Sequence, residues 1–203
     1  MAICDFDCTI TKYDVLDMLC SHVGAYEISC SINEDYINGR IDGKTALIKR
    51  FGLLEGAKLS RLSELLKEVE ISEYAELFFK ICREKGIYTI VESGNLDFVL
   101  EYFQHRLGYN MFSCSHLPII DGLLGSSTDY RCRFVQKAKY SNEYMKKRRI
   151  EKSNVIAIGD SFSDEPLFNI AEQGFLIGEK KIKLSSVVNV DSFLDIIKFI
   201  ENN

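Results

Sequence analysis

Short, continuously apolar segments recur along the chain, and stretches with helical spacing of apolar residues separate them. The apolar segments are rich in β-branched or aromatic residues and are short enough for strands that are buried on both faces of a sheet. Strands that alternate with helices in this way predict an α/β fold built on a parallel sheet. The predicted core strands are residues 1–4, 87–91, 155–158, 175–178 and 187–190.

Between the first two predicted strands, some seventy residues show helical spacing and no clear strand pattern. In the last helical stretch of this region, Ser72 is expected to be the N-terminal cap. We therefore predict a doubly wound, Rossmann-like core with an inserted helical bundle. The core comprises residues 1–11 and 86–203, and the helical insert comprises residues 12–85.

Composition narrows the class of protein. With 203 residues, 46% of them hydrophobic, the chain can bury the core of one domain that carries an insertion. A formal net charge of -5 argues against a general nucleic-acid-binding protein. No apolar run is long enough to span a membrane, and seven cysteines without a Cys-x-x-Cys pair favour free thiols. We expect a cytoplasmic protein without membrane contact.

Carboxylates follow two of the predicted strands. Asp5 and Asp7 come directly after the first strand, and Asp160 and Asp164 follow the strand at residues 155–158. Ligands of open α/β sheets bind at the carboxyl ends of the strands, where these side chains can converge. Converging carboxylates suit Mg2+, and one could also act as a nucleophile toward phosphorus. The alternative is that they are ordinary turn and helix-start residues.

A small polar turn and two lysines complete this set of side chains. Ser93, Gly94 and Asn95 lie between a predicted strand and a helix, where a hydroxyl and backbone N–H groups can bind an anion. They could equally form an ordinary turn. Lys137 and Lys139 can supply a cation, and Lys137 is favoured by its place on the helical period. Phosphoryl transfer requires a nucleophile, a metal and positive groups of this kind.

The order of these residues resembles the four motifs of the haloacid dehalogenase superfamily. The motifs are Asp5-Phe6-Asp7-Cys8-Thr9, Ser93, a lysine, and Gly159-Asp160 followed by Asp164. The helical insert and Arg50-Phe51-Gly52-Leu53-Leu54 resemble the cap of the phosphoserine phosphatase-like branch. Cys8 and Glu92 depart from the pattern, because glycine and an apolar residue are usual there.

The resemblance implies an Mg2+-dependent phosphatase of a small-molecule phosphate ester. Asp5 would be the nucleophile that takes the phosphoryl group. Asp7 would protonate the leaving oxygen and then activate water. The Asp5 carboxylate, the Asp7 backbone carbonyl and Asp160 would hold Mg2+, and Asp164 would orient the metal waters or the lysine.

By the same resemblance, the phosphate oxygens would be bound by Ser93, by the N–H groups of Gly94 and Asn95, and by the motif lysine. Asp14 and Arg50 would face the rest of the substrate from the cap, although Arg50 could instead form an ion pair within the cap. Phosphoserine or a similar metabolite is the first expected substrate. The alternatives are a phosphotransferase and a binding protein without turnover.

Overall fold

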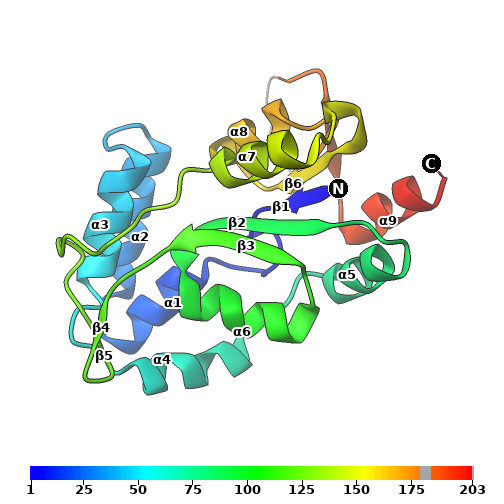
Figure 1. Ribbon diagram of the computed structural model, residues 1–203. Coiled ribbons are helices and arrows are strands. Elements are labelled where there is room, and N and C mark those ends of the chain that lie inside the picture. Colours follow the sequence, from blue (N-terminus) through cyan, green and yellow to red (C-terminus); the bar gives the residue numbers. More distant parts are fainter. Residues whose placement is uncertain (179–183, 203) are drawn as a thin grey trace.

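The computed structural model describes residues 1–178 and 184–202 (Figure 1). Within these residues, six parallel strands form one sheet in the order β3-β2-β1-β6-β7-β8. The strands are β1 (Ala2–Cys4), β2 (Thr89–Leu96), β3 (Met111–Ser115), β6 (Ile156–Gly159), β7 (Gln173–Ile177) and β8 (Val187–Val190).

Helices cover both faces of this sheet (Figure 1). On one face lie α5 (Ala75–Glu84), α6 (Asp97–Leu107) and α9 (Phe193–Asn202), and on the other lie α7 (Lys139–Arg148) and α8 (Glu165–Asn169). Side chains of β1 alternate between the two cores: Cys4 belongs to the first, and Ile3 packs with the second. This burial on both faces is why the strands are continuously apolar.

The strand order confirms the predicted doubly wound α/β core. From the central strand β1, the chain adds β2 and β3 on one side and later β6, β7 and β8 on the other. The order reverses between β1 and β6, and a crevice forms beyond the carboxyl ends of strands at such a point. Residues that follow β1, β2 and β6 are thereby brought to one edge of the sheet.

The helical insert follows β1 and consists of α1 (Val15–His22), α2 (Tyr26–Ile37), α3 (Gly43–Gly52) and α4 (Leu59–Leu65). The chain enters and leaves it through two adjacent segments, which an antiparallel bridge joins between Thr11 and Ile71. The N–H of Ser72 also donates to the carbonyl of Ile10 at 2.9 Å. Two segments paired in this way form the connection between the core and the helical insert.

The position of α5 differs from the prediction that the insert extends to residue 85. This helix packs against α9 and α6, and its Phe78 ring lies 5.1 Å from that of Phe193. We therefore propose that the helical insert spans residues 12–71 and that α5 belongs to the core. The expectation for Ser72 was wrong, because α5 begins at Ala75 and its N-cap is Tyr74, with φ of 63°.

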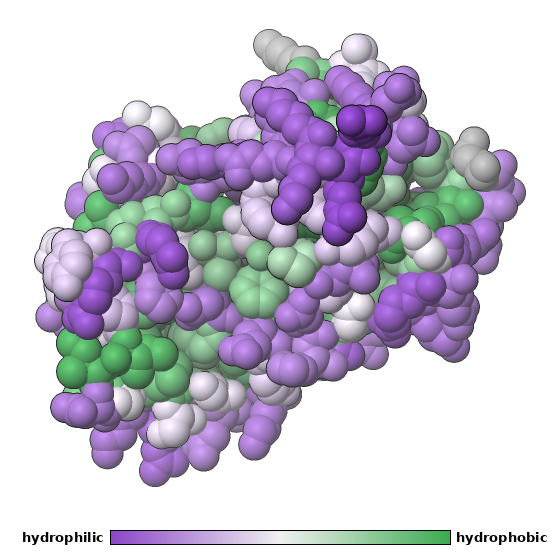
Figure 2. Space-filling view, viewed as in Figure 1, coloured by the Kyte–Doolittle hydropathy of each residue, from purple (hydrophilic) through white to green (hydrophobic). Residues whose placement is uncertain are grey.

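Two smaller features complete the fold. An antiparallel hairpin is formed by β4 (Ile119–Ile120) and β5 (Leu123–Leu124), and its Leu123 bridges to Lys58 in the insert. An apolar surface area lies over this hairpin (Figure 2), where Ile119, Ile120 and Leu123 are exposed.

Short 3-10 helices are η1 (Leu66–Glu68), η2 (Lys152–Asn154) and η3 (Phe162–Asp164). Among the described residues, no helix has both the length and the apolarity needed to cross a membrane.

Candidate active site

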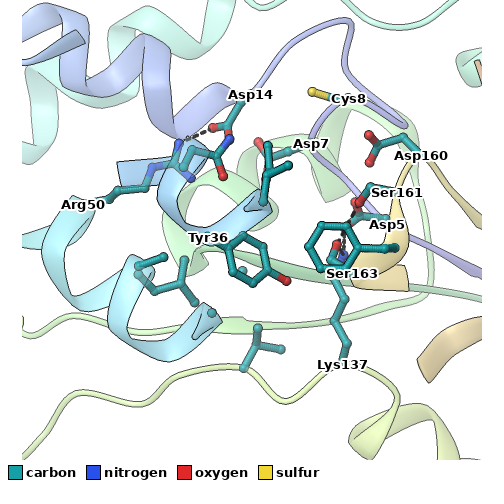
Figure 3. Close-up of a pocket in the computed structure, with 18 of the residues that line it drawn as sticks. Asp5, Asp7, Cys8, Asp14, Tyr36, Arg50, Lys137, Asp160, Ser161 and Ser163 are labelled. Carbon is teal, nitrogen blue, oxygen red and sulfur yellow. Dashed lines mark hydrogen bonds and ion pairs between the residues drawn. The ribbon is translucent and has the colours of Figure 1, made fainter. Parts of the chain in front are cut away.

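A cluster of buried carboxylates lies beyond the carboxyl ends of β1 and β6 (Figure 3). Asp5 follows β1, Asp160 follows β6, and Asp164 ends η3. Each of the three residues has one carboxylate oxygen that lies within 4.8 Å of a carboxylate oxygen of the other two. The three residues are at most 8% exposed. Carboxylates this close repel one another unless positive charge lies among them.

Lys137 supplies part of that positive charge. Its Nζ lies 2.9 Å from Asp5 Oδ1 and also contacts Asp164 Oδ1. Burial alone would lower the pKa of Lys137, but the charges of Asp5 and Asp164 outweigh it and raise the pKa. Lys139, the other predicted candidate, is exposed at the first residue of α7. The structure therefore brings Lys137, and not Lys139, into this cluster.

Burial also acts on Asp5. It raises the pKa of the Asp5 carboxyl well above its ordinary value, and the nearby charge of Asp164 raises it further, while Lys137 opposes both. Three carboxylates and one ammonium leave two formal negative charges in the buried cluster. A divalent cation would balance this charge, and oxygen donors are the ligands that Mg2+ prefers. The donor set and its charge therefore fit Mg2+.

Asp164 organises the loop that follows β6. Its Oδ2 accepts the N–H groups of Asp160 at 3.0 Å and Ser161 at 3.1 Å, and its Oδ1 accepts from Lys137. A Cβ atom on Gly159 would lie 2.5 Å from Asp164 Cγ, so this close approach requires glycine. With both oxygens engaged, Asp164 fits an orienting role toward Lys137 and Asp160.

Asp7 lies between the core and the helical insert. Its carboxylate accepts the N–H of Val15, the first residue of α1, at 2.8 Å. From the end of β2, Ser93 Oγ donates to it at 3.1 Å and Asn95 Nδ2 at 3.0 Å. Burial raises the pKa of Asp7 to about 7, with a further rise from the charge of Asp14. A carboxyl with this pKa can both donate and accept a proton near neutral pH.

The end of β2 departs from the sequence expectation, because residues 93–95 were expected to form a turn after the strand and instead lie within β2. The backbone N–H of Asn95, expected to bind phosphate, donates to Ser93 Oγ at 3.0 Å. Gly94 lines the cavity, and a Cβ atom there would lie 3.2 Å from Leu47 Cδ2 of α3. The sequence did not indicate that the Asn95 side chain would contact Asp7.

Arg50 forms an ion-pair network inside the helical insert. Its Nη2 lies 2.8 Å from both Asp14 Oδ1 and Asp17 Oδ1, and its Nε donates to Ser29 Oγ at 2.9 Å. Arg50 is buried, with 6% of its surface exposed. Arg50 therefore forms an ion pair within the insert, which was the alternative role considered for it from the sequence. Asp17 was missed, although its i+3 spacing from Asp14 on α1 could have suggested it.

A cavity of about 410 Å3 lies between the insert and the core, and it is lined by Asp5 and Asp160 of the acidic cluster and by Arg50 (Figure 3). Part of its wall is apolar. Tyr36 of α2 and Phe162 of η3 contact each other across the two parts of the chain, with ring centroids 5.4 Å apart and the rings tilted by 40°. Both aromatic residues were missed from the sequence, because either could equally have been a core residue. The cavity is enclosed by residues far apart in sequence.

Glu92 is a buried acid close to this site. It is 0% exposed, and its Oε1 accepts the N–H of Ser141 in the first turn of α7 at 2.8 Å. The N-cap of α7 is Ala138, whose side chain cannot accept a hydrogen bond. Glu92 thus serves as the capping acceptor from a neighbouring strand. Burial raises the pKa of Glu92 above its ordinary value.

We predict that Glu92→Gln stabilises the protein in a pH-dependent way. Because the pKa of Glu92 is higher in the folded than in the unfolded state, ionisation of Glu92 lowers the free energy of unfolding. This cost appears once the pH rises above the unfolded-state pKa of about 4.3. Glutamine keeps the acceptor for Ser141 without the charge. The free energy of unfolding should rise by on the order of 1 kcal/mol at pH 7.5, with the gain vanishing near pH 4. Urea unfolding at both pH values measures this, and Glu143→Gln at an exposed position of α7 is the matched control. An equal gain at both pH values would contradict the prediction.

The fold and the site define a doubly wound α/β protein with a lysine-bridged carboxylate centre at the point where strand order reverses. The sequence model for haloacid dehalogenase-like hydrolases matches residues 2–169. The chain therefore belongs to the haloacid dehalogenase-like hydrolase family, as the order of its motifs indicated.

Named relatives are similar to this chain over most of its length. A phosphoserine phosphatase of Archaeoglobus fulgidus is 25% identical over 179 residues, covering 88% of this chain and 52% of that protein. One of Streptomyces coelicolor is 24% identical over 204 residues, covering 98% and 50%. The chain thus spans about half the length of these relatives. A solved structure described as a phospho-aspartyl intermediate analogue of phosphoserine phosphatase superposes with a TM-score of 0.85 at 21% identity, covering 98% and 97% of the two chains, and supports the fold.

Proposed function

We propose that this protein is an Mg2+-dependent phosphatase that hydrolyses a small-molecule phosphomonoester through a phosphorylated Asp5. The observation that carries the proposal is the pairing of Asp5 with Lys137 inside the buried cluster that contains Asp160 and Asp164. A nucleophile beside a fixed cation and a metal-binding set of carboxylates is the arrangement that phosphoryl transfer requires. Membership of a hydrolase family supports the same reaction.

In the first step, an oxygen of Asp5 forms a bond to phosphorus while the bond from phosphorus to the ester oxygen breaks. Asp7 donates a proton to the departing oxygen, so that a neutral alcohol leaves. In the second step, Asp7 takes a proton from a water molecule, whose oxygen attacks the phosphorus of the aspartyl-phosphate. Inorganic phosphate leaves and the Asp5 carboxylate is restored. Lys137 offsets the charge that both steps bring together.

The metal would be held by the carboxylates of Asp5 and Asp160 and by the backbone carbonyl of Asp7. When bound, it supplies positive charge to the phosphoryl oxygens and balances the carboxylate cluster. We further propose that Ser93 Oγ and the N–H of Gly94 bind the same phosphoryl oxygens, because Gly94 lines the cavity and Ser93 is its neighbour on β2. Asp164 holds the loop that carries Asp160.

The substrate would occupy the cavity beneath the helical insert, with its phosphate toward Asp5. Phosphoserine is the first substrate to test, because relatives of this chain carry the name phosphoserine phosphatase. Asp14 and Arg50 line the far side of the cavity and would face the part of the substrate beyond the phosphate. Their ion pair would have to share its hydrogen bonds with a charged substrate.

The proposal predicts that phosphate release depends on Mg2+. The purified protein should release phosphate from p-nitrophenyl phosphate and from at least one member of a panel of metabolite phosphates that includes phosphoserine. Excess EDTA should reduce the rate by at least about 100-fold, and added Mg2+ should restore it. An EDTA-resistant rate would contradict the metal requirement.

The same assay separates the alternative functions. Turnover that requires an added acceptor alcohol, with the phosphate recovered on that alcohol, would indicate a phosphotransferase. A folded protein that binds Mg2+ but releases no phosphate from any ester would indicate a binding protein. Either result would overturn the proposed hydrolysis.

A further inference from the structure

The side chain of Asn95 makes contacts that the reaction as described does not use. Asn95 is 1% exposed at the end of β2. Its Oδ1 accepts the N–H of Leu96 at 2.8 Å, which fixes the orientation of the amide. Its Nδ2 therefore faces Asp7 and lies 3.0 Å from Oδ1 and 3.3 Å from Oδ2.

Ser93 also hydrogen-bonds Asp7, but in the proposed reaction its hydroxyl is also expected to bind the phosphate. Ser93 Oγ donates to Asp7 Oδ2 at 3.1 Å and accepts the N–H of Asn95. A serine hydroxyl carries one proton and can donate to one acceptor at a time. If that proton turns to a phosphate oxygen, Asp7 loses one of its donors.

Two donors to Asp7 then remain. The N–H of Val15 lies 2.8 Å from Oδ1 and belongs to α1 of the helical insert. Asn95 Nδ2 belongs to the core, because Asn95 lies on the same strand as Ser93. Asn95 is thus the side-chain donor from the core that stays on Asp7 while Ser93 binds phosphate.

We propose that Asn95 is a positioning residue. It holds the Asp7 carboxyl group in line with the leaving oxygen while the Ser93 hydroxyl donates a hydrogen bond to the phosphate. The proposal rests on the proposed phosphatase function. It assigns the side chain of Asn95, not its backbone N–H, to the reaction. An Asp7 carboxyl group that loses this donor can rotate about its χ angles, so that its proton no longer points at the ester oxygen.

The effect should depend on the leaving group. Departure of an alkoxide needs the proton of Asp7, whereas p-nitrophenolate is stable enough to leave without it. The ratio kcat/KM reports the steps up to departure of the leaving group, before the aspartyl-phosphate is hydrolysed. Asn95→Ala should lower kcat/KM by about 10- to 100-fold for an alkyl phosphate, the range for a lost hydrogen bond to a charged group. For p-nitrophenyl phosphate the loss should stay below about 3-fold.

The experiment compares Asn95→Ala and Asn95→Asp with wild type on p-nitrophenyl phosphate and on the alkyl phosphate that wild type hydrolyses fastest. Asn95→Asp keeps the size of the side chain but replaces the donor by an acceptor, so it should show the same selective loss. Asn110→Ala is the matched control, because Asn110 also binds β2, at Thr89, away from the site. It should change both rates by less than about 2-fold. Equal losses on both esters, or no loss on either, would overturn the proposal.

A crystal structure of the wild type with tungstate, a phosphate analogue, tests the same assignment without turnover. We expect Ser93 Oγ to hydrogen-bond the anion while Asn95 Nδ2 remains on Asp7. An Asn95 amide that binds the anion, or a Ser93 hydroxyl that stays on Asp7, would overturn the proposal. If the wild type releases no phosphate from any ester, the proposed phosphatase function fails. The leaving-group comparison and the tungstate structure test the role of Asn95 separately.

Discussion

Asparagine in place of Asp5 is expected to lower phosphate release by at least about 10,000-fold while the protein stays folded. The carboxylate oxygen is the proposed attacking atom, and an amide of the same shape cannot form the aspartyl-phosphate. Lys137 keeps Asp164 as a partner in this variant. Burial already disfavours the charged form of Asp5, so removal of its charge should not lower the free energy of unfolding.

The measurement is Mg2+-dependent phosphate release, together with urea unfolding of wild type and variant. Asp7→Asn is the informative companion, because the proposed acid and base would be lost while the nucleophile remains. It should form the phosphorylated enzyme slowly and hydrolyse it poorly. Residual activity of Asp5→Asn above about 1% of wild type would exclude Asp5 as the nucleophile.

Methionine in place of Lys137 is expected to lower kcat by at least about 1,000-fold. The lysine is the cation that offsets the charge of Asp5 as it approaches a phosphate dianion. Its removal also leaves Asp5 and Asp164 as neighbouring buried carboxylates, which should cost about 3–5 kcal/mol of stability. Added Mg2+ should recover part of that stability, because metal binding balances the same charges.

Lys139→Met is the matched control. The two lysines are two residues apart, and sequence alone left both as candidates for the same role. Lys139 is exposed, so its loss should change kcat by less than about 2-fold and leave unfolding nearly unchanged. A large loss of kcat in Lys139→Met with little loss in Lys137→Met would reverse the assignment.

The sequence predicted β1, β2, β6, β7 and β8 and the motif residues at the ends of β1, β2 and β6. Continuous apolar runs such as Val155 to Ile158 mark strands that helices cover on both faces, and this pattern is local. The carboxylates Asp5 and Asp160 come directly after such runs. Because parallel strands end at one edge of a sheet, their convergence follows from position in the chain.

The end of the helical insert could not be predicted in the same way. The apolar spacing of α5 is the same whether its face packs on the insert or on the core. Contact of α5 with α6 and α9 is the reason for the proposal that α5 belongs to the core. The expected cap at Ser72 was wrong because a turn precedes the helix: the N–H of Ala75 donates to the Ser72 carbonyl at 3.1 Å, and α5 begins only at Ala75.

The sequence by itself determined the α/β class, the presence of an insert and the acidic groups of the site, because each depends on short-range pattern. The tertiary structure alone brought Lys137 rather than Lys139 to Asp5, Glu92 to the first turn of α7, and Asn95 to Asp7. These contacts depend on the directions of side chains from elements far apart in the chain. The separation ranges from 49 positions, for Glu92 and Ser141, to 132 positions, for Asp5 and Lys137. Sequence spacing does not fix such directions, which are set when the two sides of the sheet and the helical insert pack together.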